Sequence, residues 1–283
     1  MSEPIPVTDA ADPRVADYTG LRDPARRMRV EAEQGFFVGE GELVVRRMVR
    51  HGAALRSVLV TPLRYAALGD VLARLDAPVY VASDAVLRAV AGFDLHRGAV
   101  AAAHRPLPAL PAALLARPSV RTVLALERVN DHENLGSLFR SAASLAVDAV
   151  LLCPECCDPL YRRCVRVSMA HVLTVPWAVT GPWPQALAEV AAAGFTIAAL
   201  TPGGEITLDD FAASRRNDAR VVLLLGAEGP GLRAATMSVA DARVRVPMAA
   251  GTDSLNVAVA AAIAAYALAP RTGVMRSPIL EIS

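Results

Sequence analysis

The amino-acid sequence predicts an α/β protein with two domains, each built from strands that alternate with helices. Short apolar runs rich in Val, Leu and Ala recur along the chain. Amphipathic or Ala-rich stretches separate them, which is typical of parallel strands covered on both faces. Four prolines between 106 and 118 divide this alternation into two parts. The 283 residues, 54% of them hydrophobic, suffice for two buried cores.

Composition and the prolines set the expected boundaries. We predict a flexible N-terminus at 1–19, a small α/β domain at 20–105, a proline-rich linker at 106–118, a larger α/β domain at 119–270 and a C-terminal tail at 271–283.

In the smaller domain, acidic residues precede basic ones along the first helix, as the helix macrodipole favours, and Ser83 is placed as an N-cap. We expect helices at 41–51, 64–75 and 83–91, and strands at 57–61, 78–82 and 98–103.

In the larger domain, the strands are the most apolar runs of the chain. We expect strands at 121–127, 148–153, 172–177, 195–200, 220–226 and 242–247, and helices at 134–146, 159–168, 183–193, 231–238 and 254–268. Parallel sheets of this kind bind ligands outside the carboxyl ends of their strands, so we expect the chemistry in this domain.

Composition also excludes several classes of protein. The longest apolar run, Val257 to Ala269, has 13 residues, fewer than the roughly 20 that span a bilayer. The N-terminus lacks a signal-peptide pattern, so we expect a soluble, cytoplasmic protein with no membrane partner. No G-x-G-x-x-G is present, and a chain without lysine cannot complete a P-loop, which argues against NAD binding and P-loop phosphoryl transfer.

The four cysteines lie close together, at 153, 156, 157 and 164. With His171 downstream, the Cys153-x-x-Cys156 pair raises the question of zinc, but no second C-x-x-C pair exists and Cys164 falls within an expected helix. We therefore expect reduced thiols and no metal.

Three polar groups follow the expected strands of the larger domain. In the first, Asn134 is a good N-cap and Arg140 follows one to two turns later; a capped helix with a solvated arginine is the alternative. In the second, Gly226-Ala-Glu-Gly-Pro-Gly-Leu232, the glycines bring backbone amides close to a ligand and Glu228 ends a buried strand, unless it is an exposed cap.

The third group is Pro247-Met248 followed by Ser254-Leu-Asn256-Val257. Ser254 serves there as a simple N-cap or as a site residue. Asn256 falls in the first turn of a strongly apolar helix, where its side chain needs a hydrogen-bond partner.

Taken together, the three groups resemble the motifs of the SpoU (TrmH) family of the SPOUT superfamily, the knotted RNA ribose 2'-O-methyltransferases. The family pattern N-x-G-x-x-x-R is matched by Asn134, Gly136 and Arg140, G-x-E-x-x-G-L by Gly226, Glu228, Gly231 and Leu232, and P-M with S-L-N-V by the third group. The resemblance covers 119–270, while 20–105 is similar, more loosely, to a small RNA substrate-binding domain. Ala170 and Ala258 depart from the family pattern, which usually has Gly and often has Ser there.

The resemblance implies a parallel sheet with a trefoil knot, S-adenosylmethionine as cofactor, no metal, and a homodimer whose active site is completed across the interface. It implies RNA as substrate, rRNA rather than tRNA. The implied catalytic residues are Asn134, Arg140, Glu228, Ser254 and Asn256. The implied cofactor contacts are Leu200, Thr201, Pro202, Gly226, Glu228, Gly231, Val246, Pro247, Met248, Ser254 and Leu255.

Arg140 is the residue that this resemblance implicates in activating the ribose hydroxyl. Deprotonating an arginine with a pKa near 13.8 at pH 7 costs about 9 kcal/mol, so we favour a clamp on an RNA phosphate over a general base. Two other functions stay open: a non-catalytic RNA-binding or assembly protein with this fold, and a base methyltransferase of the same superfamily. Residues 21–66 contain nine arginines but only five acidic residues, and this local excess of positive charge indicates a basic surface for RNA.

Overall fold

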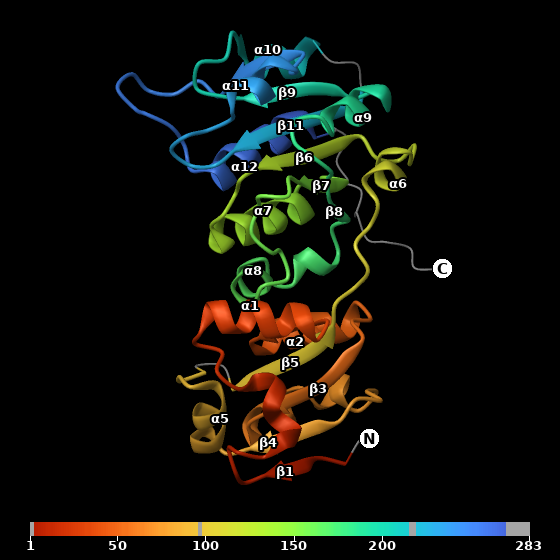
Figure 1. Ribbon diagram of the computed structural model, residues 1–283, viewed down its shortest axis with the longest axis vertical. Helices are drawn as coiled ribbons and strands as arrows, with labels where there is room; N and C mark the ends of the chain where they lie inside the picture. The colour runs from red at the N-terminus through yellow and green to blue at the C-terminus, as the bar shows by residue number, and fades with distance from the viewer. Residues whose placement is uncertain (1–2, 96–97, 215–218, 270–283) are drawn as a thin grey trace. The chain divides into compact units, whose positions relative to one another are not determined.

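The computed structural model describes residues 3–95, 98–214 and 219–269, which divide into two units (Figure 1). Unit 1 contains the chain up to 107 together with 160–173, and unit 2 contains 108–159 and the chain from 174 onward. The division near 107 falls at the proline-rich segment. Residues 160–173, which the sequence assigns to the larger domain, belong instead to unit 1. The expected tail at 271–283 lies outside the described residues.

Unit 1 is built on a mixed sheet, whose described strands follow the order β1-β4-β3-β5-β2. Strand β3 runs parallel to β4 and antiparallel to β5. The strands are β1 (Ile5–Val7), β2 (Phe36–Glu40), β3 (Leu55–Val60), β4 (Val79–Ala82) and β5 (Ala99–His104). The helices are η1 (Pro13–Tyr18), α1 (Pro24–Glu33), α2 (Glu42–Arg50), α3 (Pro62–Ala67), α4 (Gly69–Leu72), α5 (Asp84–Ala91), α8 (Arg162–Val167) and η2 (His171–Leu173).

Where the sequence predicts a flexible stretch at 1–19, the described residues form β1 and η1 and pack into the core of unit 1. Strand β1 pairs with β4, and Val15 and Tyr18 are buried. The Tyr18 hydroxyl lies 2.7 Å from Ser57 Oγ, which satisfies both polar groups inside the core. Prolines and acidic residues interrupt this segment too often for a hydrophobic period to be visible in the sequence. The expected helix at 64–75 is likewise divided in two, at Leu68.

Unit 2 is built on a sheet in which every described strand pair is parallel, in the order β10-β12-β9-β11-β6-β7-β8. The strands are β6 (Thr122–Glu127), β7 (Ala149–Leu152), β8 (Trp177–Val179), β9 (Thr196–Leu200), β10 (Ile206–Thr207), β11 (Val221–Gly226) and β12 (Ala242–Arg245). The helices are α6 (Pro111–Leu115), α7 (His132–Ser144), α9 (Leu187–Ala192), α10 (Leu208–Ser214), α11 (Ala234–Ser238) and α12 (Val257–Leu268). The trefoil knot stays a prediction.

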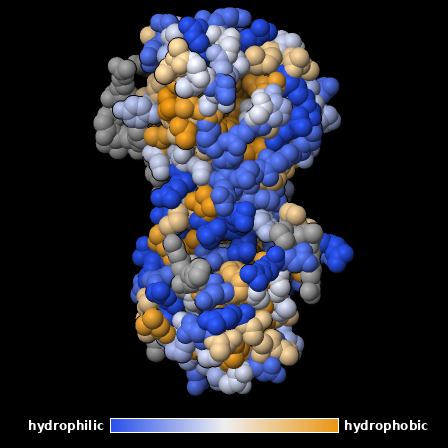
Figure 2. Space-filling model, turned by 90° about the vertical axis from the view of Figure 1, so that its left-hand side faces the viewer, coloured by the Kyte–Doolittle hydropathy of each residue, from blue (hydrophilic) through white to orange (hydrophobic). Residues whose placement is uncertain are grey.

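Helices cover both faces of the unit 2 sheet. Alternate side chains of β6, β9 and β11 pack with α6, α9 and α11, while α7 and α12 pack together on the other face against β6 and β11. Burial on both faces explains why these strands are continuous apolar runs. On the face drawn in Figure 2, hydrophilic residues surround several hydrophobic patches. Within the described chain, no helix combines the length and apolarity needed to cross a bilayer.

Several regions of unit 2 differ from the sequence prediction, among them α6, which forms within the expected linker at 106–118. The strand expected at 172–177 is absent: residues 171–173 form η2, and β8 begins only at Trp177, after Pro176, which lacks the N–H that a strand ladder uses. The sequence pattern also missed β10 and α10, whose two and seven residues are too short for a clear period.

Arg220, just before β11, joins three segments of unit 2. Its guanidinium donates to the carbonyl oxygens of Val120 at 3.1 Å and Ala193 at 2.6 Å, and also to that of Leu115. It stacks on the Phe195 ring at 4.0 Å. The Leu115 and Ala193 carbonyls lie at the ends of α6 and α9, and the Val120 carbonyl lies just before β6, so a single cation satisfies acceptors that two helices leave open together with one from a strand start.

We expect Arg220→Ala to lower the free energy of unfolding of unit 2 by about 2–3 kcal/mol, because it strands several carbonyl acceptors. Urea unfolding followed by tryptophan fluorescence measures this, since both tryptophans, Trp177 and Trp183, belong to unit 2. Arg243→Ala is the control: Arg243 pairs with Glu205 at the surface at 3.5 Å, which is worth less than about 1 kcal/mol. Equal losses in the two variants would contradict this role.

Candidate functional site

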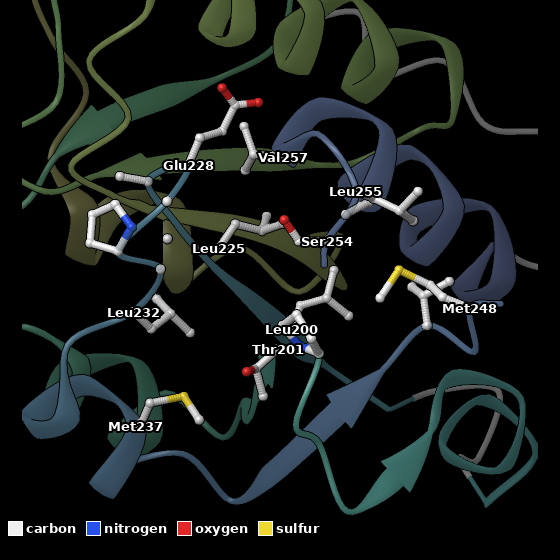
Figure 3. A pocket seen from close by; sticks show the side chains of 18 residues that line it. Leu200, Thr201, Leu225, Glu228, Leu232, Met237, Met248, Ser254, Leu255 and Val257 are labelled. Atoms are coloured by element: carbon white, nitrogen blue, oxygen red, sulfur yellow. The ribbon is translucent and has the colours of Figure 1, made fainter. Parts of the chain in front are cut away.

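The carboxyl ends of three neighbouring strands, β9, β11 and β12, border a cavity of about 280 Å³ in unit 2 (Figure 3). Because these strands are parallel and adjacent, their ends meet at one edge of the sheet, although they are far apart in the sequence. The loop that leads into α12 closes the cavity. The cavity is lined by Leu200, Thr201, Pro202, Leu225, Gly226, Ala227, Glu228, Gly229, Pro230, Gly231, Leu232, Met237, Val246, Met248, Ser254, Leu255, Val257 and Ala260.

The residues that the resemblance assigns to the cofactor gather at this cavity, with one exception. Pro247 does not line it. Those that do are Leu200, Thr201, Pro202, Gly226, Glu228, Gly231, Val246, Met248, Ser254 and Leu255. Their role in binding stays a prediction.

The walls of the cavity are mainly aliphatic. Leu225, Leu232 and Met237 lie around the hollow in Figure 3, and the Glu228 carboxylate points away from them. Among the described residues that line it, Glu228 is the only ionisable side chain, so the lining carries no positive charge. Such a site favours a flat apolar group, and it offers no repulsion to a cation.

The glycine loop after β11 (Gly226–Leu232) folds back on itself. Ala227 and Gly231 form a β-bridge, with the Gly231 N–H donating to the Ala227 carbonyl at 2.9 Å. A Cβ on Gly226 would lie 2.3 Å from the Gly231 carbonyl carbon. Gly226 therefore lets two backbone segments touch, which no larger residue permits without moving the wall of the cavity.

Asn256 joins the three sequence motifs. Its Oδ1 accepts from the N–H groups of Ala258 at 2.9 Å and Val259 at 3.2 Å and so caps α12. Its Nδ2 donates to Asn134 Oδ1 at 2.8 Å and to Glu228 Oε1 at 2.5 Å. The two backbone donors fix the orientation of the amide, because only the oxygen can face them. The oxygen of this carboxamide thus caps a helix while its nitrogen binds two other side chains.

The helix starts at the site differ from the sequence prediction. Asn256 is the N-cap of α12 and not part of its first turn, and Ser254 is an exposed loop residue that does not cap it. Asn134 is not an N-cap either: α7 begins two residues earlier, and Asp131 Oδ1 accepts from the N–H groups of Glu133 and Asn134. Each shift is a choice between nearby capping residues, which the sequence leaves ambiguous.

Glu228 and Arg140 also lie differently from expectation. Glu228 is exposed and does not end a buried strand. Arg140 is exposed on α7, does not line the cavity, and has no acidic partner among the described residues. It lies six residues beyond Asn134, about 9 Å further along the helix axis. Asn134, Glu228 and Asn256 are therefore brought together within one chain, whereas Arg140 is not brought to them.

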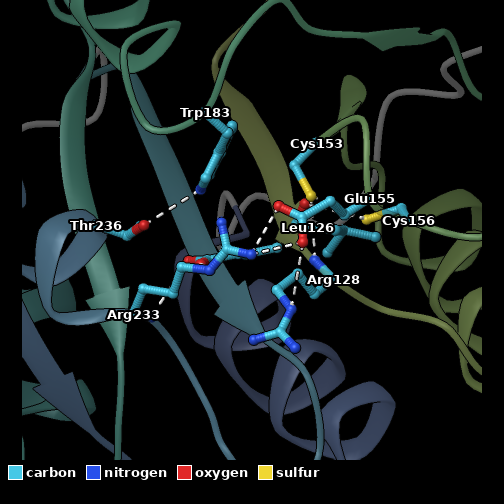
Figure 4. A network of polar contacts seen from close by, with 9 residues as sticks. Leu126, Arg128, Cys153, Glu155, Cys156, Trp183, Arg233 and Thr236 are labelled. Atoms are coloured by element: carbon cyan, nitrogen blue, oxygen red, sulfur yellow. Dashed lines mark hydrogen bonds and ion pairs between the residues drawn. The ribbon is translucent and has the colours of Figure 1, made fainter.

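An ion-pair network behind the glycine loop was missed by the sequence reasoning (Figure 4). Glu127, fully buried at the end of β6, lies 3.4 Å from Arg233 Nε, and the Arg233 N–H donates to its other oxygen at 3.4 Å. Arg233 Nη2 also donates to Glu155 at 2.5 and 2.7 Å. This arrangement anchors the residue that directly follows Leu232. The available signal was Glu127 itself, an acidic residue closing an otherwise apolar strand.

Metal ligands do not gather in the part of the chain that the structure describes: no cluster of three or more His, Cys, Asp or Glu residues there is arranged to hold an ion.

Comparison with known proteins agrees with this geometry. Residues 121–266 match the SpoU rRNA methylase family. An uncharacterized tRNA/rRNA methyltransferase of Mycobacterium tuberculosis is 47% identical over 261 residues, covering 92% of this chain and 90% of that protein. The crystal structure of an AdoMet-bound rRNA methyltransferase from Sinorhizobium meliloti matches with a TM-score of 0.78 and 25% identity, over 94% of this chain and 97% of that one. A crystal structure of an RNA 2'-O ribose methyltransferase matches with a TM-score of 0.75 and 27% identity, over 93% and 98%.

The contact between Asn134 and Asn256 can be tested by a double-mutant cycle. We expect Asn256→Ala to cost about 1–2 kcal/mol of stability through loss of the cap, and a coupling energy with Asn134→Ala of about 0.5–1 kcal/mol. Urea unfolding of the four proteins measures both. Ser144→Ala, which removes a hydroxyl near the far end of α7, is the control partner and should add without coupling. Strict additivity of the Asn134 and Asn256 variants would show that the contact contributes nothing.

Proposed function

Because the chain belongs to the SpoU rRNA methylase family, we propose that it transfers a methyl group from S-adenosylmethionine to a ribose 2'-hydroxyl of RNA. The observation that carries this proposal is the cavity lined by the second and third motifs, to which the first motif is joined through the hydrogen bond between Asn134 and the Asn256 carboxamide. A relative named as a tRNA/rRNA methyltransferase and a similar structure named as an RNA 2'-O ribose methyltransferase support the substrate and the position of the methyl group. Between tRNA and rRNA, we favour rRNA as the substrate.

The residues around the cavity fit S-adenosylmethionine. The aliphatic walls suit the adenine ring, and a lining without positive charge suits a sulfonium. Backbone N–H and C=O groups of the loops after β9, β11 and β12 would hold the polar edges of the molecule. When bound, the cofactor supplies an electrophilic methyl group, and a similar rRNA methyltransferase from Sinorhizobium meliloti is described as AdoMet-bound.

Arg140 enters this proposal from a second copy of the chain. Its exposed guanidinium lies away from the cavity of its own chain, and the cluster of Asn134, Glu228 and Asn256 is open to solvent on one side. Helix α12 presents three apolar side chains, Val259, Ile263 and Tyr266, that are 47%, 38% and 69% exposed. They follow one another at helical spacing, as in a helix face that packs against a partner. A homodimer through this face would cover them and bring Arg140 to the partner's cavity.

The main role of these residues in the proposed reaction is to position the ribose hydroxyl against the methyl group. Good alignment of a nucleophile and an electrophile supplies about 7–11 kcal/mol of barrier lowering. Arg140 clamps the RNA phosphate beside the target ribose and donates to its 2'-oxygen, so that negative charge developing on that oxygen is stabilised while the hydroxyl proton passes late to solvent water. Asn256 and Glu228 hold the loop geometry on the substrate side, with Asn134 and Ser254.

The basic surface expected in unit 1 is weaker than the arginine count suggests. Asp70 and Asp17, both outside the counted segment, pair with Arg46 at 2.5 Å and Arg56 at 2.9 Å. Glu42 pairs with Arg64, and Arg27 is buried against Glu31. The arginines left exposed and without a described ion pair are Arg22, Arg29 and Arg50. We propose that these three, rather than the whole set, contact RNA phosphates.

The proposed function is tested by incubating the protein and labelled S-adenosylmethionine with total RNA from a strain that lacks the gene. A methyl group on the 2'-oxygen blocks alkaline cleavage, so the label should appear in alkali-resistant dinucleotides. Label confined to mononucleotides would identify a base methyltransferase. RNA binding without transfer or cofactor binding would identify an assembly protein.

We expect Gly226→Ala to weaken binding of S-adenosylmethionine at least tenfold, because the added methyl group meets the Gly231 backbone and displaces the cavity wall. Isothermal titration calorimetry measures the dissociation constant. Gly203→Ala is the matched control, since a Cβ there has nothing within 4 Å, and it should bind normally. Normal binding by a folded Gly226→Ala protein would remove this loop from the cofactor site.

The shared active site predicts complementation between inactive variants. Arg140→Ala should be inactive, and Gly226→Ala should be nearly inactive at a cofactor concentration far below its weakened dissociation constant. An equal mixture after subunit exchange should then recover about one quarter of the wild-type activity, because half of the dimers hold one intact site of two. Methyl transfer before and after exchange measures this. Activity that stays at the level of the separate variants would place Arg140 and the cavity in the same chain.

A further inference from the structure

A dithiol in unit 2 lies outside the cavity and has no part in the proposed methyl transfer. Cys153 and Cys156 bound the tight turn Cys153-Pro-Glu-Cys156 after β7, in which the Cys156 N–H donates to the Cys153 carbonyl at 3.0 Å. Their Sγ atoms are 3.8 Å apart, and both thiols are free. The ends of such a turn are less than about 7 Å apart, so a small adjustment of the turn brings the sulfurs to bonding distance.

The backbone around the pair favours a thiolate. The Arg128 N–H donates to Cys153 Sγ at 3.2 Å, from a residue in the left-handed region (φ 57°). The Cys156 thiol and this N–H lower the pKa of Cys153 to about 6, the thiol being the larger cause. Neighbouring Cys157 is the opposite case, because burial raises the pKa of its thiol to about 12. As the pH rises, the first proton is therefore lost from the Cys153–Cys156 pair and not from the Cys157 thiol.

We propose that Cys153 and Cys156 form a redox-active dithiol, which glutathione disulfide or a similar small disulfide oxidises, and that the resulting disulfide loosens the glycine loop of the cavity. The pair loses one proton, and the other proton is held between the two sulfurs, so that half-buried Cys156 can attack as the thiolate while Cys153 carries the proton. The attack breaks the S–S bond of the small disulfide and releases one small thiolate, which takes the proton from Cys153. The thiolate that this leaves on Cys153, buried beside it, then attacks Cys156 Sγ and releases the second small thiolate, which takes up the proton first lost. One disulfide and two protein thiols become one protein disulfide and two small thiols.

The coupling to the cavity runs through Glu155, which lies inside the turn. Its carboxylate pairs with Arg233, and Arg233 directly follows Leu232 in the cavity wall. Drawing the two sulfurs together by nearly 2 Å reshapes the turn that carries Glu155. We expect this pair to weaken and the glycine loop to lose one of its anchors. This part of the inference rests on the proposed function, because it assigns cofactor binding to that loop.

The test uses the full-length protein equilibrated in buffers from fully reduced to fully oxidised glutathione. Peptide mapping by mass spectrometry should find one Cys153–Cys156 disulfide, with the loss of two hydrogens. Calorimetry should then show that oxidation weakens binding of S-adenosylmethionine severalfold, and that reduction with dithiothreitol restores it. Cys157→Ser is the matched control and should behave like wild type. Cys156→Ser should form no such disulfide and keep its affinity in every buffer.

Two results would overturn the inference: no intramolecular disulfide at any glutathione ratio, or a disulfide that leaves the affinity for S-adenosylmethionine unchanged. Glu155→Ala adds a further check, since its reduced form should already bind more weakly and should lose most of its response to oxidation. Failure of the reduced wild-type protein to bind the cofactor would instead count against the proposed function, because the disulfide is detected by mass alone.

Discussion

The carboxamide of Asn256 is the contact on which the geometry of the site depends. Its oxygen satisfies the first N–H groups of α12, and its nitrogen holds Asn134 of α7 and Glu228 of the glycine loop. A helix start, a second helix and a strand-end loop are thereby fixed by one planar group. An acid at this position would lack the donors, and a hydroxyl would lack the reach.

The parallel sheet makes this contact possible. Strands β9, β11 and β12 bring three loops to one edge, and the ion pair between buried Glu127 and partly exposed Arg233 anchors the end of the loop that follows β11. The cavity is therefore built largely from backbone and aliphatic surface, while the polar side chains stand at its rim. This division suits the proposed reaction, in which the methyl donor is bound by shape and charge and the RNA that accepts the methyl group is positioned by hydrogen bonds.

The sequence predicted the two-part α/β organisation and the central strands of both sheets, because β6, β9 and β11 are long apolar runs buried on both faces. It also predicted the cavity loops after β11 and β12, which carry the second and third motifs, whereas the loop after β9 was expected only from the family resemblance. It failed where several residues compete locally: Asp131 rather than Asn134 caps α7, and Asn256 rather than Ser254 caps α12. It did not predict β1 or the Glu127–Arg233 pair, since both depend on contacts between residues that are distant in the sequence.

The chain passes between the two units three times, because 160–173 belongs to unit 1 although the sequence on either side of it belongs to unit 2. Arg162 pairs with Glu40 and donates to the Leu21 carbonyl, and Arg47 donates to the Met169 carbonyl at 2.8 Å. A gene fragment that ends at the proline-rich segment would therefore encode unit 1 without residues 160–173, which belong to that unit. Neither unit can therefore be exchanged between proteins as one continuous stretch of sequence. A recombination event at the proline-rich segment would also have to transfer 160–173, which contains α8.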